Sequence, residues 1–443
     1  MSEKKPREPM QRRIAYAQLV FNHPILKEDR MTRCRYYGML NYYCKRLFRI
    51  TKYGKAILSY YKTFFNIERQ SHNKKQLSTR LRVTLLLDIV HIAGYNSSFI
   101  NSSVLKSFRF DSKLFAILDG LFSNLCYENS MWDELMNNKY VKAEAAWIEC
   151  MRRNVAFSRK KPFKIMVTAT MSAGKSTFIN ALVGERVAST NNLACTGRLH
   201  YIYSKPVDDF LIGKWDRQIV LDAQNSILNK NEETQERISY ESIYYKGRLR
   251  GMHCMILDTP GVNSAEYQKH GECTNNAILS GAYDALVFLI NYEHIGTDDE
   301  IAHLSFIKQN VNDSVPILFC VNKIDSMDMD DASLEVKMHS LKEYLQEQGF
   351  VDPTIFFVSS RAAFLNRLSS ASNRALSKNE TNEMLVNSVK LGIIDLPGLY
   401  HKMKLQFINK EDNRQYDDFD FQCGIGYIEE YIIKLMLKKE RND

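Results

Sequence analysis

Apolar residues recur at helical spacing in the first third of this chain, and as short continuous runs in the rest. Leucine and isoleucine return every three or four residues between positions 77 and 92, which predicts a helix that ends near Gly94. Asp111 and Ser112 stand where the cap of a second helix is expected. A third helix is predicted from about Met131 to Phe157.

Basic and aromatic residues alternate in the segment from Ile14 to Glu68, with helical spacing over 35–47 and 56–67. Residues 1–80 hold 19 Lys/Arg and 5 Asp/Glu, a charge of +14, whereas the whole chain carries +9, so the remainder sums to −5. Cations interleaved with aromatics can bind the phosphates and stack on the bases of nucleic acid, or bind the surface of an anionic lipid membrane. They can equally be a partner surface, or a helical region with core aromatics and solvated charges.

From residue 163 onwards, buried-strand runs alternate with helical patterns at 298–311 and 333–348. This order predicts an α/β fold with a doubly wound, mostly parallel sheet, whose site lies at the strand C-termini, preceded by an all-helical N-terminal part. Residues 205–250 are expected to be a polar insert, partly helical near 215–228. The predicted division is a basic, aromatic-rich helical segment (1–74), a helical domain (75–158) and a nucleotide domain (159–443).

A phosphate-binding motif is indicated where the first of these strands ends. Residues 164–177 read as an apolar strand, a loop of small residues, and a helix that begins at Gly-Lys-Ser-Thr. Loop amides and the positive helix end bind phosphate, the lysine reaches the outer phosphates, and the serine hydroxyl serves Mg²⁺. The nucleotide-binding residues predicted in this loop are Ala169, Ser172, Ala173, Gly174, Lys175, Ser176 and Thr177.

One residue of this loop departs from the usual pattern. Ala169 stands where such loops have glycine, and alanine resists positive φ. The alternative interpretation of the motif taken alone is a tight strand-to-helix turn with an incidental lysine.

Three further motifs follow in order at predicted strand ends. Asp258 begins Asp-Thr-Pro-Gly, in which the carboxylate holds Mg²⁺ through water and the Gly261 amide faces the terminal phosphate. Asp325 can accept hydrogen bonds from two guanine N–H groups and would lose a partner on adenine. The residues predicted to read guanine are Asn322, Lys323 and Asp325, with Ser359 and Ser360 near O6. Together the motifs predict a domain that binds GTP and GDP.

A threonine in the polar stretch 184–196 is expected to close over Mg²⁺ and the γ-phosphate. Its position before the strand 199–203 favours Thr196, with Thr190 as the alternative. The predicted metal ligands are Ser176, Thr196 and Asp258, and the predicted catalytic residues are Lys175, Ser172 and Thr196. No general base is predicted, because phosphoryl transfer depends on positioning and electrostatics.

Composition places this chain among cytoplasmic proteins, with peripheral membrane attachment left open. No apolar run approaches the roughly 20 residues that span a bilayer, and the basic N-terminus lacks the apolar core of a signal peptide. Nine cysteines occur without any Cys-x-x-Cys pair, which is typical of free thiols and gives no indication of a metal site.

The stretch Ser172–Gly184 resembles the first motif of dynamin-like GTPases, especially bacterial ones, whereas Era-type GTPases usually have Asn-Val before Gly-Lys-Ser. The motifs at 258–264, 321–325 and 359–363 and the closing Gly424-Ile425-x-x-Ile428-Glu429 are similar to that family too. The resemblance covers about residues 139–437. It implies Mg²⁺-dependent hydrolysis of GTP to GDP and phosphate, stimulated when two GTPase domains meet across their nucleotides.

The resemblance also raises two questions about this chain. Classical dynamins have glutamine where Met171 stands, and methionine cannot orient the attacking water, so that role falls to backbone, to Ser172 or to a partner. Dynamins carry a long helical stalk, which here would come from residues 14–157 or from a stalk-bearing dynamin-like partner.

Three functions therefore stay open at this point. The first is a dynamin-like enzyme at membranes. The second is an Era-type switch with an RNA- or ribosome-docking N-terminal part, and the third is a nucleotide-gated interaction module with little turnover.

Overall fold

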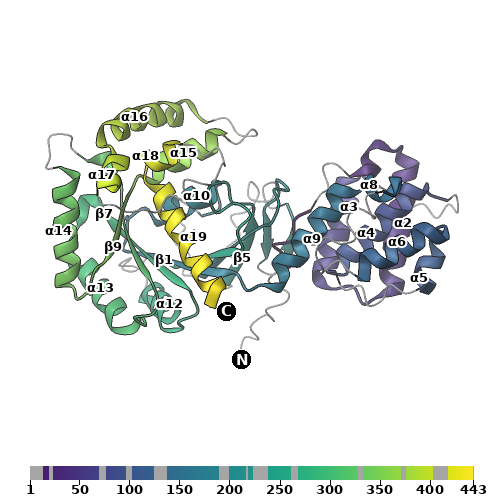
Figure 1. Cartoon of the computed structure of the whole chain (residues 1–443), viewed down its shortest axis with the longest axis horizontal. Coiled ribbons are helices and arrows are strands. Elements are labelled where there is room, and N and C mark those ends of the chain that lie inside the picture. Colours follow the sequence, from purple (N-terminus) through teal and green to yellow (C-terminus); the bar gives the residue numbers. More distant parts are fainter. Residues whose placement is uncertain are drawn as a thin grey trace. The chain divides into compact units, whose positions relative to one another are not determined.

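The computed structural model describes residues 13–18, 23–68, 76–95, 102–123, 137–188, 199–215, 218–222, 238–260, 268–327, 333–370, 376–402 and 418–442. The chain divides into two compact units. The first comprises Met1–Lys161, Lys205–Thr234 and Tyr240–Tyr244, and the second comprises Pro162–Ser204, Gln235–Ser239 and Tyr245–Asp443. Figure 1 shows both, coloured along the sequence. The three-part division predicted from the sequence, 1–74, 75–158 and 159–443, stays a prediction.

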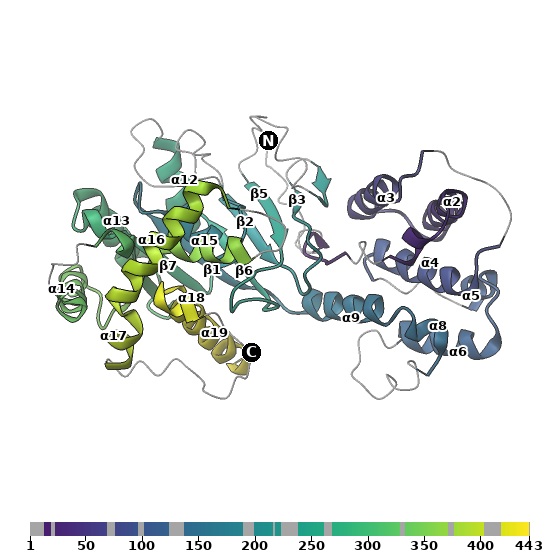
Figure 2. The same ribbon diagram turned by 90° about the horizontal axis from the view of Figure 1, so that it is seen from above.

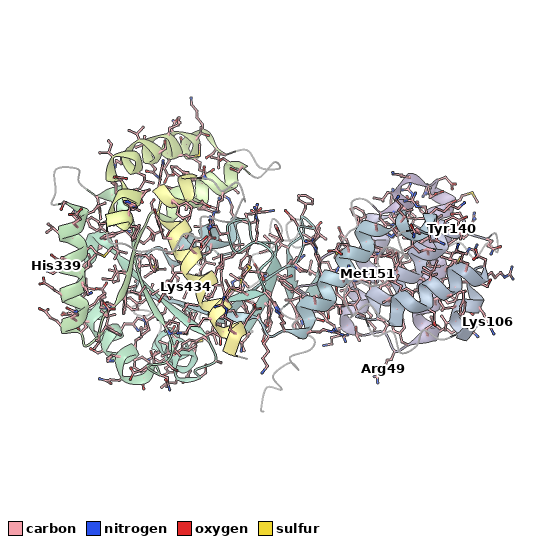
Figure 3. All side chains as sticks on the ribbon, in the orientation of Figure 1. Arg49, Lys106, Tyr140, Met151, His339 and Lys434 are labelled. Atoms are coloured by element: carbon pink, nitrogen blue, oxygen red, sulfur yellow. The ribbon has the colours of Figure 1, made fainter. Side chains whose placement is uncertain are left out.

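Helices build most of the first unit. They are η1 (Pro24–Lys27), α2 (Arg30–Leu47), α3 (Lys52–Phe64), α4 (Thr79–Ile92), α5 (Ser102–Ser107), α6 (Ser112–Ser123), α8 (Lys139–Lys142) and α9 (Ala145–Arg159). Helix α4 is buried at nearly every position from Val83 to Ile92, since it is apolar around most of its circumference. Met151 on α9 contributes to the same core and is labelled in Figure 3.

The capping residues predicted from the sequence occupy the expected places. The Asp111 carboxylate accepts a hydrogen bond from the Leu114 amide at 2.8 Å, directly before α6. Gly94 follows α4 with φ of +69°. The single helix predicted over 131–157 is wrong for the described residues: the backbone leaves the helix at Glu144, whose buried carboxylate accepts a hydrogen bond from Arg80 at 3.0 Å.

A buried carboxylate lies at the centre of this helical core. Asp88 on α4 accepts hydrogen bonds from Tyr36 at 2.6 Å and from the Trp147 indole at 3.1 Å. Of the ten aromatics from Tyr36 to Phe65, five are buried in the core: Tyr36, Tyr37, Tyr53, Tyr61 and Phe65. These five rings are therefore part of the folded interior and cannot stack on nucleic-acid bases.

The polar insert contains strands where helix was expected. Strands β3 (Gly213–Trp215), β4 (Ile219–Val220) and β5 (Ile238–Ile243) pair antiparallel, β4 with β3 and β3 with β5. The helix predicted near 215–228 is wrong for the described part of that range. Trp215 stacks on Tyr240 across the β3–β5 pair, with ring centroids 5.5 Å apart, and large aromatic and β-branched residues favour strands.

The second unit is built on parallel strands. They are β1 (Phe163–Ala169), β6 (Cys254–Asp258), β7 (Ala285–Asn291), β8 (Ile317–Asn322) and β9 (Thr354–Val358), joined by the antiparallel β2 (Leu199–Ser204). Within this unit the strand order is β2-β6-β1-β7-β8-β9. Non-consecutive neighbours of this kind require helical crossovers, so the predicted doubly wound fold is confirmed.

Helices cover both sides of these strands. They are α10 (Lys175–Val183), α12 (Gln268–Leu279), α13 (Asp298–Asn310), α14 (Leu334–Glu347), α15 (Ser360–Ser370), α16 (Lys378–Ile394), α17 (Leu396–Lys402), α18 (Asp418–Gln422) and α19 (Ile425–Asn442), with short η3 (Tyr292–His294) and η4 (Ile324–Ser326). Figure 2 shows α12 and α13 on one side of the parallel strands and α18 and α19 on the other.

The register of the parallel strands brings the predicted motifs to one edge of the sheet. Val167 pairs with Asp258, and Asn322 pairs with Asn291 on one side and Val358 on the other. The strands β1, β6, β8 and β9 thus deliver their motifs at the same carboxyl edge. Across the described parts of the chain, no helix combines enough length and hydrophobicity to cross a lipid bilayer.

Candidate functional site

The phosphate loop follows β1 directly. Ala169 is the last residue of that strand, pairs with Leu289 on β7 and is completely buried. Positive φ angles occur further along the loop, at Ser172 (62°) and Gly174 (86°). Alanine at position 169 therefore takes up strand geometry and needs no left-handed backbone, so its difference from the usual glycine imposes no strain.

Gly174 occupies a place that no larger residue fits. It is the N-terminal cap of α10, and a Cβ built on it would lie 2.4 Å from Asn322 Nδ2. Left-handed backbone and lack of space therefore both call for glycine here.

Asn322 connects two of the predicted motifs. Its Nδ2 donates to the Ala173 carbonyl at 2.8 Å, and its Oδ1 accepts from the Ser360 amide at 3.0 Å. The side chain is buried, so both hydrogen bonds are shielded from water. Asn322 thereby fixes the phosphate loop against the Ser359-Ser360 turn.

Lys175 and Asp258 form an ion pair at the end of the site that the sequence predicts to bind phosphate. The Lys175 ammonium donates to Asp258 Oδ1, and the two side chains are only 13% and 14% exposed. Thr259, the next residue, donates its hydroxyl to the Val167 carbonyl at 3.0 Å. The turn after β6 is thus tied to the strand that carries the phosphate loop.

The oxygen donors predicted to hold Mg²⁺ come from two neighbouring elements. Ser176 is half-buried in the first turn of α10, and Asp258 ends β6 beside β1. A hydroxyl and a carboxylate suit a hard cation that keeps waters and phosphate oxygens as its other ligands. The predicted residues Thr196, Thr190 and Gly261 lie outside the described residues, and Met171 is 60% exposed on the loop.

Asp325 lies at the other end of the site, beside the Ser359 turn. The Ser359 hydroxyl donates to Asp325 Oδ1, and the Ser359 amide donates to the Cys423 carbonyl at 2.9 Å. The Ser360 hydroxyl is fully buried and has no hydrogen-bond partner among the described residues. A buried donor without a partner is costly, which favours a polar ligand at this turn.

Lys323 is held by a residue that the sequence reasoning did not identify. Its backbone is left-handed (φ of 69°), and its ammonium donates to Glu293 Oε2 at 2.8 Å. This hydrogen bond lowers the pKa of the Glu293 carboxyl below its ordinary value. The only sequence signal for Glu293 is its place in η3, just after β7, the strand that pairs with β8.

Arg367 is a second residue missed from the sequence. Its guanidinium binds Glu429 at 2.7 Å and Asp420 at 2.7 Å, and donates to the Ala181 carbonyl on α10 at 2.7 Å. Burial alone would lower the pKa of Arg367, but the two carboxylates raise it. The group anchors the helix that follows the phosphate loop. Glu429, an acidic residue within an apolar helix, was the signal that a buried cation should face it.

Comparison with known proteins relates this domain to one protein family. Residues 165–325 match the family model described as the dynamin family. Dynamin-like protein A of Bacillus subtilis (strain 168) is 21% identical over 207 residues, which are 44% of this chain and 16% of that protein. An uncharacterized protein in the xynA 3′ region of Caldicellulosiruptor sp. (strain Rt8B.4) is 29% identical over 171 residues, covering 38% and 41% respectively.

The chain thus spans less than half the length of these two curated relatives. Among solved structures, one of an oligomerised bacterial dynamin pair, described as a mechanism for long-range sensing and tethering of membranes, is 17% identical. It covers 97% of this chain and 63% of its own, at a TM-score of 0.36. Residues 165–325 of this chain are therefore similar to the dynamin family.

Proposed function

We propose that this dynamin-like chain binds GTP and GDP with Mg²⁺ and hydrolyses GTP to GDP and phosphate. The proposal rests on two pairs of polar side chains, one at each end of the same sheet edge. Lys175 and Asp258 stand at the phosphate end, and Asp325 and Ser359 stand at the base end. Asn322 joins the two ends through hydrogen bonds of 2.8 and 3.0 Å.

Each residue has a proposed role in binding the phosphates. The amides of Ala173 to Thr177 face the phosphate oxygens, and Lys175 neutralises charge that develops between the β- and γ-phosphates. Bound Mg²⁺ supplies further charge neutralisation, and Ser176, Thr196 and Asp258 are the residues that would hold it. The Gly261 amide is proposed to sense the γ-phosphate.

Base selection is proposed to depend on the Asp325 carboxylate. Its contact with the Ser359 hydroxyl fixes the carboxylate's direction before a base arrives, and such preorganisation lowers the cost of binding. Guanine offers two N–H donors to this carboxylate, whereas adenine leaves it short of a partner. Lys323, Ser359 and Ser360 complete the proposed guanine site.

Nucleotide binding and turnover by three variants test this function. Lys175→Ala should abolish GTP binding or hydrolysis, while Lys342→Ala, which changes an exposed lysine on α14, should leave both unchanged. Asp325→Asn should shift preference from GTP to xanthosine triphosphate. Unchanged GTP turnover in Lys175→Ala, or unchanged selectivity in Asp325→Asn, would refute the corresponding role.

We propose further that hydrolysis is stimulated by association of two GTPase domains. Met171 is exposed beside the phosphate loop and its thioether cannot position the attacking water. A second domain could supply that group, in a second copy or in a stalk-bearing partner. Specific activity should then rise with protein concentration. Constant, very low activity at every concentration would instead favour the nucleotide-gated module with little turnover.

The first unit is proposed to dock on an anionic membrane. The sequence from Met31 to Ile67 contains no Asp or Glu, and six cations in this range are exposed: Lys45, Arg46, Arg49, Lys52, Lys55 and Lys62. Figure 3 shows Arg49 extending from this unit. Of the aromatics discussed above, Tyr42 is 53% exposed and five are buried, which favours charge contact with lipid headgroups over base stacking.

Vesicle flotation tests this docking surface. Phosphatidylglycerol-containing vesicles should float the protein and pure phosphatidylcholine vesicles should not. Charge reversal at Lys45, Arg49 and Lys52 should abolish flotation, while Lys106→Glu, exposed elsewhere in the same unit, should preserve it. Retention on RNA without flotation would replace the membrane with nucleic acid as the target.

A further inference from the structure

Helix α16 of the second unit exposes a stripe of large aliphatic side chains. Leu385, Val386, Val389 and Ile393 are 57%, 55%, 66% and 63% exposed. Their spacing of one, three and four residues places them on one helix face, whereas Asn387 and Leu391 are buried on the other. Among the described residues, no other helix exposes more than two large hydrophobic side chains.

The stripe is free of competing charge. Lys390 lies within this span, but its ammonium donates to the Asp325 carbonyl at 3.1 Å. Glu383, one turn earlier, is engaged by Arg361 through two hydrogen bonds of 2.9 and 2.7 Å. Contiguous exposed apolar surface of this kind marks an interaction site more often than a random surface does.

We propose that α16 pairs antiparallel with α16 of a second copy of this chain. The inference rests on the proposed function, because it names the surface through which two GTPase domains associate. In a two-fold symmetric pair, Val386 would face Val389 of the partner subunit, and Val389 would face the partner's Val386. The two β-branched side chains are then neighbours in an uncharged seam.

The charges at the ends of α16 favour this orientation over the parallel one. Lys378 at the N-terminus and Asp395 just beyond the C-terminus are both exposed. In the antiparallel register Lys378 lies about 3 Å along the axis from Asp395 of the partner subunit, given a rise of about 1.5 Å per residue. A parallel pair would place Lys378 beside the partner's Lys378, and like charges repel.

The same charges argue against a lipid occupant. Helices that lie on anionic membranes carry Lys and Arg along the polar face. Around the stripe, Lys378 and Lys390 are matched by Glu380, Glu383 and Asp395. One pair of helices also buries less than the roughly 1,200 Å² of a stable interface, so the dimer should be weak and concentration-dependent.

Helix α16 is attached to both ends of the proposed nucleotide site. Glu380 in its first turn pairs with Arg186 at 2.6 Å, and Arg186 belongs to the polar stretch 184–196, in whose sequence Thr190 and Thr196 also occur. Lys390 binds the backbone of Asp325. Pairing of two α16 helices would therefore act on elements that touch phosphate and base.

Sedimentation equilibrium of the full chain, without and with GTP, tests the surface. Wild-type protein should self-associate, and Val389→Asp should weaken its association constant at least tenfold. Val336→Asp is the matched control, because Val336 is a 54% exposed valine on α14 of the same unit. Both variants should keep the wild-type melting temperature and GDP affinity, since both positions are exposed.

A cross-linking experiment covers the case in which Val389→Asp disturbs the fold. A mixture of Val386→Cys and Val389→Cys proteins should form a mixed disulfide dimer under mild oxidation, and wild type should not. Equal association of wild type and Val389→Asp, absence of the cross-link, or wild-type binding to vesicles through Val389 would overturn the proposal. Absence of GTP and GDP binding in the wild type and the variants alike would refute the proposed function, while their association constants could still be compared.

Discussion

The contact between Gly174 and Asn322 makes a quantitative prediction for nucleotide affinity. The perturbation is a double-mutant cycle of Gly174→Ala and Asn322→Ala. In the first variant the new Cβ would lie 2.4 Å from Asn322 Nδ2 and must displace it from the Ala173 carbonyl. In the second, both the Ala173 carbonyl and the buried Ser360 amide lose their partner.

The size of each effect follows from these contacts. Left-handed backbone at alanine costs about 1–2 kcal/mol, and each lost hydrogen bond costs about 1 kcal/mol. Gly174→Ala should therefore cost about 2–3 kcal/mol and Asn322→Ala about 2 kcal/mol. The bond to Ala173 is lost in both variants, so the double variant should fall short of additivity by about 1 kcal/mol, or roughly fivefold in affinity.

Calorimetric titration with GDP and Mg²⁺ measures these differences. We expect the cost to fall on affinity, because the free loop can relax whereas the phosphate-bound loop cannot. Lys342→Ala on α14 serves as the control for unrelated surface change. Strict additivity, or wild-type GDP affinity in Gly174→Ala, would show that the two residues do not meet in the nucleotide-bound protein.

Three further predictions concern stability and Lys323. Arg367→Ala should lower the free energy of unfolding by about 3–5 kcal/mol in chemical denaturation, because Glu429 and Asp420 stay buried without their cation. Arg361→Ala is the control and should lower it by under about 1 kcal/mol, because the pair of Arg361 with Glu383 is partly exposed. Burial lowers the pKa of His303 to about 4. The free energy of unfolding should therefore fall by about 3 kcal/mol as the pH drops from 6.5 towards 4. His303→Gln should flatten this pH dependence of stability. Glu293→Gln should weaken GTP binding less than fivefold, an effect that high salt removes, because the Lys323 pair is partly exposed.

Much of the fold, and the order of the motifs along the chain, could be predicted from the sequence. The apolar runs that became β1, β6, β7, β8 and β9 are each bounded by polar motifs, so their type and order could be inferred locally. The helix caps at Asp111 and Gly94 could be predicted equally well, since cap chemistry depends on residues that are neighbours in the sequence.

Features that depend on distant partners could not be read in this way. The strands at Trp215 and Ile219 are short, and their pairing depends on Tyr240, far along the chain. The break in helix at Glu144 depends on Arg80. No periodicity or motif encodes such contacts.

The same distinction between local and distant information applies to the candidate site. The motif residues could be named from their order, yet the links among them, from Asn322 to Ala173 and from Lys323 to Glu293, required the folded chain. The assignments of the motif residues to nucleotide and Mg²⁺, those of Thr196 and Gly261 included, stay predictions.

The ion pair of Lys175 with Asp258 has a thermodynamic consequence for ligand order. In this pair, the cation proposed to bind phosphate and the anion proposed to bind metal neutralise each other. Nucleotide alone would draw the lysine away and leave the carboxylate facing phosphate, while metal alone would leave the ammonium facing a dication. Each ligand removes the repulsion that the other meets, so their affinities are mutually enhanced by the same factor.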